Sequence, residues 1–234
     1  MDPSAASGRS LGQRRFACFA VLLLAYLLFV IVFGAWVRIT GSGAGCGAHW
    51  PSCRGELVPR TPSQATLIEY THRLTSGLLG LLALALPLWA RRVLPAGHPA
   101  RRASWAALLF VGVEAAIGAA LVKNGLVAQD DSVARAVVVA LHLVNTLLLT
   151  GSTALAALWA WPTQESPGSA RVTRRVGLAG VALVGLCLVA ASGAVTALGD
   201  TLFPVASSAA VAASRHFLVQ LRILHPLIAS LVGC

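Results

Sequence analysis

The sequence contains few charged residues. Asp, Glu, Lys and Arg together make up 11% of its 234 residues, whereas 57% are hydrophobic. No soluble domain of this size needs so much apolar surface, so the scarcity of charge predicts an integral membrane protein. The net charge of +10 raises the question of nucleic-acid binding. However, the basic residues lie between apolar runs and form no groove-like patch, so we expect no nucleic-acid partner.

Six apolar runs are long enough to cross a bilayer, which takes about 20 residues each. They cover residues 16–37, 66–90, 103–122, 134–161, 176–198 and 216–234. We therefore predict an all-α polytopic membrane protein with about six transmembrane helices. The first run is too long for the apolar part of a signal peptide, and we interpret it as an uncleaved first helix.

Basic residues are unevenly divided between the two sets of loops. One side carries ten of them: Arg9, Arg14, Arg15, Arg91, Arg92, Arg101, Arg102, Arg171, Arg174 and Arg175. The other side carries six, together with four acidic residues: Arg38, Arg54, Arg60, Lys123, Arg135 and Arg215, and Glu56, Asp130, Asp131 and Asp200. Because cytoplasmic loops carry the excess of Arg and Lys, we expect a cytoplasmic N-terminus in the bacterial plasma (inner) membrane.

Two of the five cysteines lie close together in the loop after the first run. Six residues separate Cys46 from Cys53. In the expected orientation this loop faces an oxidising compartment, so a disulfide is one interpretation. Free thiols, or a metal site that includes His49, are the alternative. The other three cysteines lie in apolar runs, where packing explains them; they are Cys18, Cys187 and Cys234.

Three histidines lie at similar depths in the second, fourth and sixth runs, which all cross the membrane in the same direction. His72, His142 and His225 are 6, 8 and 9 residues from the starts of these runs. That places them about 9 to 14 Å below the outer boundary. Glu69 and Arg73 share a helix face with His72. Because lipid cannot solvate such groups, we expect these faces to point into a helix bundle.

The lack of acidic residues in the runs restricts what the histidines can bind. A zinc protease needs H-E-x-x-H, and a di-iron bundle needs two Glu-x-x-His motifs plus further glutamates. The runs contain one such motif, from Glu69 to His72, and Glu114 as their one other acid. A haem fits better, because it takes an imidazole on each side of the iron and cations near its edge. We predict that His72 and His142 bind one haem, with Arg73 as a candidate propionate partner.

A weak internal repeat leaves His225 without a partner histidine. The first and fifth runs end in "FGAWVRITGSG" and "ASGAVTALGDT", and Glu69-x-x-His72 is matched by Arg222-x-x-His225. We interpret helices one to four as a unit that is repeated from helix five, with halves at 1–161 and 162–234. The second half is then incomplete, and we expect two more helices beyond it, with a histidine that partners His225.

The segments "GAWVRITGSGAGCGAHWPSC", "IEYTHR" and "ALHLVNTLLL" together resemble the haem A synthase family. These membrane oxidoreductases oxidise haem O to haem A for terminal oxidases. The resemblance implies two similar four-helix bundles and the conversion of a ring methyl to a formyl group, using O₂ and an external electron donor. The implied partners are the lipid bilayer, haem O synthase, oxidase assembly factors and a second copy of the chain.

The resemblance also implies a role for each site residue. His72 and His142 are the expected axial ligands of the substrate haem O, and Glu69 is the expected catalytic carboxylate. Glu69 is expected either to transfer a proton or to stabilise positive charge on the substrate carbon. The remaining implied features are a permanent haem b bound by His225 and a disulfide between Cys46 and Cys53.

Two residues depart from the family pattern, and two other functions fit parts of the sequence. His49 lies where an acidic residue is expected, and Glu114 where a neutral amide such as Gln is expected. The main alternative function is a b-type cytochrome membrane subunit that transfers electrons without chemistry of its own. A transporter with intramembrane charge pairs is a weaker alternative. Glu69 also has a structural interpretation, as an ion-pair partner of Arg73 or Arg222.

Overall fold

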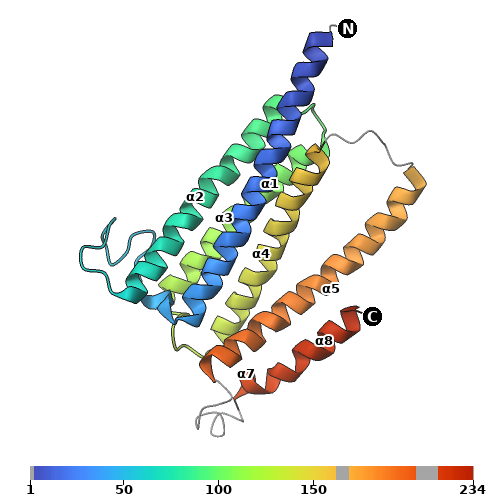
Figure 1. Ribbon diagram of the computed structural model, residues 1–234. Coiled ribbons are helices and arrows are strands. Elements are labelled where there is room, and N and C mark those ends of the chain that lie inside the picture. Colours follow the sequence, from blue (N-terminus) through green and yellow to red (C-terminus); the bar gives the residue numbers. More distant parts are fainter. Residues whose placement is uncertain (1–2, 162–168, 204–215, 234) are drawn as a thin grey trace.

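A computed structural model describes residues 3–161, 169–203 and 216–233 (Figure 1). Two sequence predictions concern residues beyond these ranges. The second predicted half begins at residue 162, which lies outside the described residues. The last cysteine, residue 234, also lies outside them.

The described chain is built from helices, and the predicted all-α polytopic architecture is confirmed. The long helices are α1 (Pro3–Ile39), α2 (Gln64–Val93), α3 (Pro99–Lys123), α4 (Val133–Ala160) and α5 (Ser169–Leu202). The short segments are η1 (Ser42–Ala44), α7 (Phe217–Gln220), η3 (Leu221–Ile223) and α8 (Leu224–Gly233). Each long helix contains a stretch that is long and apolar enough to cross a membrane, and Phe217–Gly233 forms a shorter apolar helix.

Capping residues fix where three of these helices begin. The Ser63 hydroxyl accepts a hydrogen bond from the backbone N–H of Thr66 at the start of α2, and Ser132 caps α4 in the same way. At the start of α3, Nδ1 of His98 accepts the N–H of Ala100 at 3.2 Å. Burial lowers the pKa of His98, which favours the neutral ring that can accept this bond.

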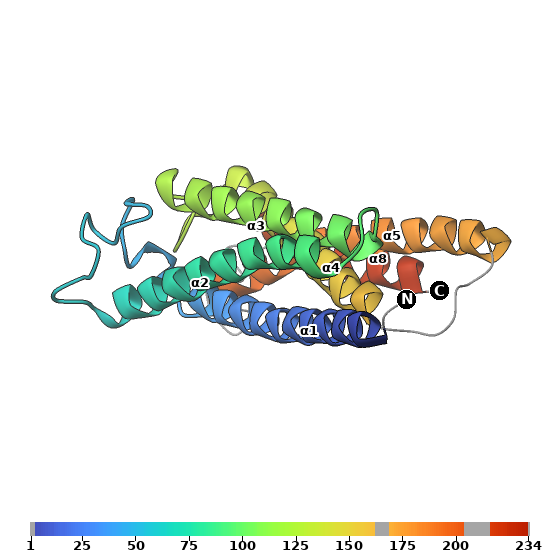
Figure 2. The same ribbon diagram turned by 90° about the horizontal axis from the view of Figure 1, so that it is seen from above.

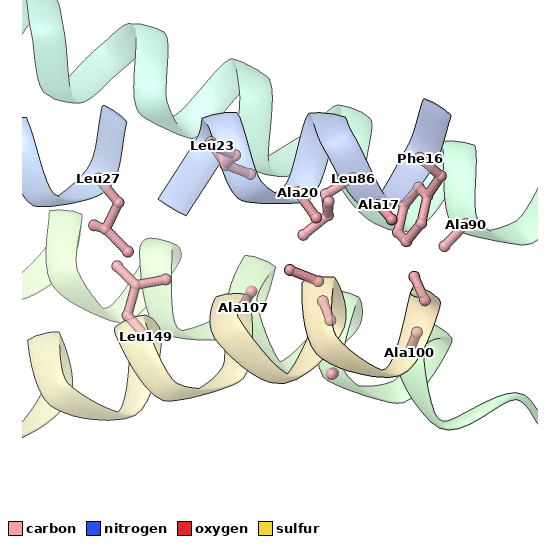
Figure 3. Close-up of a cluster of buried hydrophobic side chains, with 14 of the residues drawn as sticks. Phe16, Ala17, Ala20, Leu23, Leu27, Leu86, Ala90, Ala100, Ala107 and Leu149 are labelled. Atoms are coloured by element: carbon pink, nitrogen blue, oxygen red, sulfur yellow. The ribbon is translucent and has the colours of Figure 1, made fainter. Parts of the chain in front are cut away.

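The first four helices pack into a bundle. α1 contacts α2 and α4, and α3 contacts the same two helices, as the views from the side and from above show (Figures 1 and 2). The apolar core lies in the half of the bundle that contains the start of α1 and the end of α2. Figure 3 shows α1 side chains such as Leu27 facing Leu149 of α4. Many core residues are alanines, which let the helix backbones approach closely.

Polar groups gather at the other end of the bundle, where α1 ends and α2 and α4 begin. We call it the loop end, because the loop with Cys46 and Cys53 lies there. The buried polar residues of this end include Glu69, Arg135 and Asn145. The apolar half therefore supplies the packing, and the loop end holds the candidate site.

The α5 helix lies beside α4, and α8 packs back along α5 (Figure 1). Glycines in α5 make this close approach feasible. A Cβ at Gly185 would lie 2.7 Å from Cγ1 of Val232, and one at Gly199 would lie 3.0 Å from the backbone oxygen of Leu218. A larger residue at either position would force the last helical segment away from α5.

Candidate functional site

The three histidines lie at nearly the same depth in their helices. His72 is 8 residues after the start of α2, His142 is 9 after the start of α4, and His225 is 8 after Phe217. At about 1.5 Å per residue the depths are about 12 to 14 Å. The depths of the three histidines therefore agree more closely when they are counted from the observed helix starts than from the starts predicted from the sequence.

His72 lies against a glycine of the neighbouring helix. A Cβ at Gly34 of α1 would lie 3.1 Å from Cε1 and 3.3 Å from Nε2 of the imidazole. The ring also packs edge-on against Phe33, with 5.6 Å between ring centroids. Its Nδ1 is buried and has no hydrogen-bond partner among the described residues. His142 lies within electrostatic reach of His72, so the structure brings these two imidazoles into one neighbourhood.

His142 lies beside Glu114, the acid that departs from the family pattern. The distance from His142 Nδ1 to Glu114 Oε1 is 3.4 Å, although the alignment does not make a hydrogen bond. The Glu114 carboxylate accepts hydrogen bonds from the Thr146 hydroxyl and from the Asn145 side-chain amide. That amide also donates to the backbone oxygen of Phe110 at 2.9 Å. Two polar side chains of α4, Asn145 and Thr146, thereby hold the Glu114 carboxylate of α3 beside the histidine ring.

Glu69 joins α2 to the cysteine loop. It is 3% exposed, and its Oε1 lies 2.5 Å from Nη2 of Arg73. Its Oε2 accepts the backbone N–H of Cys46 at 2.8 Å. Arg73 Nη1 donates to the backbone oxygens of His49 and Ser52, both at 2.7 Å. The ion pair anticipated between Glu69 and Arg73 is therefore present. The propionate role of Arg73 stays a prediction, and its donors are directed to the acid and the loop.

The loop itself is closed by a disulfide between Cys46 and Cys53, both fully buried. The free-thiol and metal-site alternatives for this pair are therefore wrong. At Gly45 a side chain would overlap the backbone of Ala65, so the loop lies directly on the first turn of α2. The Thr66 hydroxyl secures this contact by donating to the backbone oxygen of Gly45 at 2.8 Å.

His225 lies apart from the other two histidines, in the contact between α5 and α8. Its Nδ1 is 3.0 Å from the hydroxyl of Ser192, and a Cβ at Gly193 would lie 3.0 Å from its Cε1. Arg222, one turn before it, forms an ion pair with Asp200 at 2.8 Å. Arg222 is therefore not the partner of Glu69.

Sequence reasoning missed several of these residues. Gly34 and Gly193 stood out only as part of a repeated Gly-Ala pair, and their contacts with histidines depend on how the helices pack. Ser192 gave no signal, because isolated serines are common in membrane helices. The helix-to-loop bonds of Arg73 depend on the path of the loop.

Comparison with known proteins shows which family the chain belongs to. The model of the COX15-CtaA family, described as cytochrome oxidase assembly protein, matches residues 17–234. The chain belongs to this family. The resemblance to haem A synthases that the sequence motifs predicted is thereby confirmed.

Three relatives show how far the similarity extends. A Thermus thermophilus protein named protoheme IX farnesyltransferase is 51% identical over 225 residues, which are 94% of this COX15-CtaA chain and 37% of the relative. A heme A synthase of Alkalihalophilus pseudofirmus is 39% identical over 113 residues, 48% of the chain and 38% of the relative. A heme A synthase of Geobacillus kaustophilus is 38% identical over 136 residues, 58% of the chain and 40% of the relative. The chain thus matches about two fifths of the length of each.

Proposed function

We propose that this COX15-CtaA chain carries the substrate site of a haem A synthase, which oxidises a ring methyl of haem O to a formyl group for terminal oxidase assembly. One observation carries the proposal. Two imidazoles lie within electrostatic reach of each other at matched depth, on α2 and α4, two helices that α1 and α3 both contact. His72 is also one turn from the buried carboxylate of Glu69, which holds the disulfide-closed loop. The relatives named heme A synthase support the same reaction.

The residues present fit a haem. His72 has a buried Nδ1 with no hydrogen-bond partner in the described ranges, and Gly34 keeps clear the space beside its ring that a Cβ would fill. His142 has a carboxylate on the Nδ1 side of its ring, as histidines that bind a metal through Nε2 commonly do. In this proposal His72 and His142 bind the substrate haem, and His225 binds a permanent haem b in the second half. The iron would supply O₂ activation, with electrons from an external donor.

The contacts of Glu69 favour one of its two expected roles. The ion pair with Arg73 and the N–H of Cys46 hold it as a carboxylate in a fixed position. A fixed negative charge stabilises positive charge that develops nearby in a transition state. We therefore assign Glu69 this electrostatic role at the edge of the ring. Arg73 and the loop keep the carboxylate in place and exclude water from it.

The name of the Thermus relative raises a second reaction, prenyl transfer. Prenyl diphosphates are commonly bound through Mg²⁺, which is held by carboxylates and the substrate's phosphates. In the described ranges no three His, Cys, Asp or Glu side chains lie close enough together to hold a metal ion. The buried Glu69 and the partly buried Glu114 are also engaged, the first by Arg73 and the second by Asn145 and Thr146. These contacts support oxidation over prenyl transfer as the function of this region.

The decisive experiment replaces Glu69 with Gln in the full-length protein. Gln keeps an oxygen that accepts the N–H of Cys46 but removes the charge. We expect bound haem to be retained and haem A formation to fall by roughly 100-fold. The measurement is chromatography of haems extracted from cells that make the protein together with a source of haem O.

Two control variants define the interpretation. His142→Ala should lower the haem content of the purified protein, because it removes a proposed ligand. Arg60→Gln, in the exposed part of the loop, should change neither haem content nor product. Haem A formation at the parent rate by Glu69→Gln would contradict the role of the carboxylate. If the parent protein leaves haem O unaltered, the b-type cytochrome interpretation is supported instead.

A further inference from the structure

Two arginines at the loop end of the bundle each have a buried Nε without a hydrogen-bond partner among the described residues. Arg38, in the last turn of α1, makes no side-chain hydrogen bond or ion pair with any described residue, and its Nε is buried. Arg135, in the first turn of α4, is 5% exposed. Its Nη1 donates to the backbone oxygens of Ala128 and Asp130, at 2.7 and 2.5 Å. Its Nε is buried and has no hydrogen-bond partner within the part of the chain that the structure describes.

Two other arginines near the histidines are partly buried and differ in one respect. Arg73 is paired with Glu69, and Arg222 is paired with Asp200. Arg38 and Arg135 have no carboxylate within ion-pair distance among the described residues. An unpaired charge in a membrane protein's interior is costly and generally marks a functional site.

Helix periodicity places both arginines on the faces that hold the imidazoles. Arg38 follows Gly34 by four residues, so it lies on the face of α1 that contacts His72, about 6 Å closer to the loop end. Arg135 precedes His142 by seven residues, or two turns. It therefore lies on the same face of α4 as that histidine, about 10 Å closer to the loop end.

The two arginines also lie near each other. α1 packs against α4, and a Cβ at Gly43, just after α1, would lie 3.6 Å from the Val127 side chain. Val127 lies in the α3–α4 loop, the loop whose backbone oxygens accept the hydrogen bonds of Arg135. The guanidinium groups of Arg38 and Arg135 are within electrostatic reach of each other. Like charges in a medium of low dielectric constant repel unless an anion lies between them.

Asp130 does not form an ion pair with either arginine. Its charge attracts that of Arg135, but its carboxylate accepts a hydrogen bond from the hydroxyl of Ser132 at 2.8 Å. Arg38 receives no such compensation from the described residues. The pair therefore retains donors and positive charge for an anionic ligand.

We propose that Arg38 and Arg135 bind the propionate carboxylates of the porphyrin held by His72 and His142, the role that the sequence had given to Arg73. This inference rests on the proposed function. Guanidinium groups bind carboxylates through two parallel hydrogen bonds. Both arginines lie one to two turns closer to the loop end than the groups on their faces that mark the imidazoles, Gly34 and His142, and would be available to the acidic groups of a haem held there. Arg73, in contrast, already donates to Glu69 and the loop carbonyls.

The test compares two probes that differ only in the carboxylates: protohaem and its dimethyl ester. Each is titrated into the purified full-length protein, freed of haem, and dissociation constants are measured from the Soret absorbance. The parent protein is expected to bind protohaem more tightly than the ester. Arg38→Gln should weaken protohaem binding roughly tenfold or more and leave ester binding unchanged. Arg60→Gln, an arginine that is 89% exposed, should match the parent with both probes.

Arg38 is the decisive position because its side chain makes no hydrogen bond or ion pair with the described residues that a substitution would break. Without ligand, Arg38→Gln should unfold at a temperature equal to or above that of the parent, since it removes a partly buried charge that has no partner in the described ranges. Arg135→Gln should weaken protohaem binding in the same direction. However, it also frees the carbonyls of the α3–α4 loop, so its unfolding temperature has to be measured beside its affinity.

The outcomes separate this site from the proposed function. If the parent binds neither probe, the proposed function is overturned and this site with it. If the parent binds both probes equally well and Arg38→Gln is unchanged, the arginine site is overturned while haem binding stands. A loss of ester binding in Arg38→Gln equal to the loss of protohaem binding also overturns it, because the arginine would then support the fold and not the carboxylates.

Discussion

At the scale of single residues, the surroundings of Glu114 explain how an acid is tolerated where the family pattern predicts an amide. The hydroxyl and amide donors of Thr146 and Asn145 replace part of the hydration that the carboxylate loses in the bundle. The same arrangement holds negative charge 3.4 Å from Nδ1 of His142. Negative charge beside that nitrogen makes the opposite ring nitrogen a more basic ligand.

Glu114→Gln should therefore change the properties of a haem bound by His142 without removing it. We expect the midpoint potential to rise, because a neutral amide stabilises the ferric state less than a carboxylate does. Glu114→Leu, which removes the acceptor altogether, should lower haem affinity by about 10-fold. Redox titration and haem titration of the purified variants measure the two effects. Glu56→Gln, in the exposed loop, is the control, and an unchanged potential in both Glu114 variants would argue against the contact.

At the scale of helices, the same contact occurs twice. Gly34 of α1 meets the ring of His72 on α2, and Gly193 of α5 meets the ring of His225 on α8. In both pairs the glycine belongs to a Gly-Ala sequence near the end of one helix, and the histidine lies 8 residues into the next apolar helix of the repeat. The repeat stays a prediction, and these two contacts are alike in packing a histidine ring against a helix backbone.

Gly34→Ala tests what this packing contributes. The added methyl would lie 3.1 Å from Cε1 of His72, so the ring has to move. We expect haem content to fall several-fold while the helix persists, because Ala is the better helix former. Gly112→Ala in α3, where an added Cβ meets nothing within 4 Å, is the matched control. Pyridine haemochrome analysis of both purified variants gives the haem content, and equal contents would contradict the tight contact.

At the scale of the whole molecule, the sequence predicted the spans well because a bilayer demands long apolar runs. It predicted helix ends less well. α1 begins at Pro3 and α5 at Ser169, well before their apolar runs, because a helix continues beyond the hydrocarbon and hydropathy marks only the lipid-embedded part. The contacts of Arg73 with the loop could not be predicted, since they depend on turns such as the one at Gly47, which has φ +64°. Arg38 counted only toward topology, because a cation at a helix end is typical of the membrane interface.

Membrane orientation is a further property of the whole molecule. The distribution of basic residues predicts that the α2–α3 loop is cytoplasmic and the α3–α4 loop faces outward. A membrane-impermeant maleimide applied to intact cells should label Gln129→Cys and should label Ala96→Cys only after the cells are permeabilised. Both residues are exposed, and the parent protein, with Cys18 and Cys187 in helices α1 and α5, is the control. Labelling in the opposite order would reverse the topology.

The two repeated glycine–histidine contacts differ in one respect that bears on residence time. The hydroxyl of Ser192 lies 3.0 Å from Nδ1 of His225, whereas Nδ1 of His72 has no hydrogen-bond partner in the described chain. A hydrogen bond at one ring nitrogen fixes the orientation of an imidazole. A group bound by His225 is therefore expected to leave more slowly than a group bound by His72.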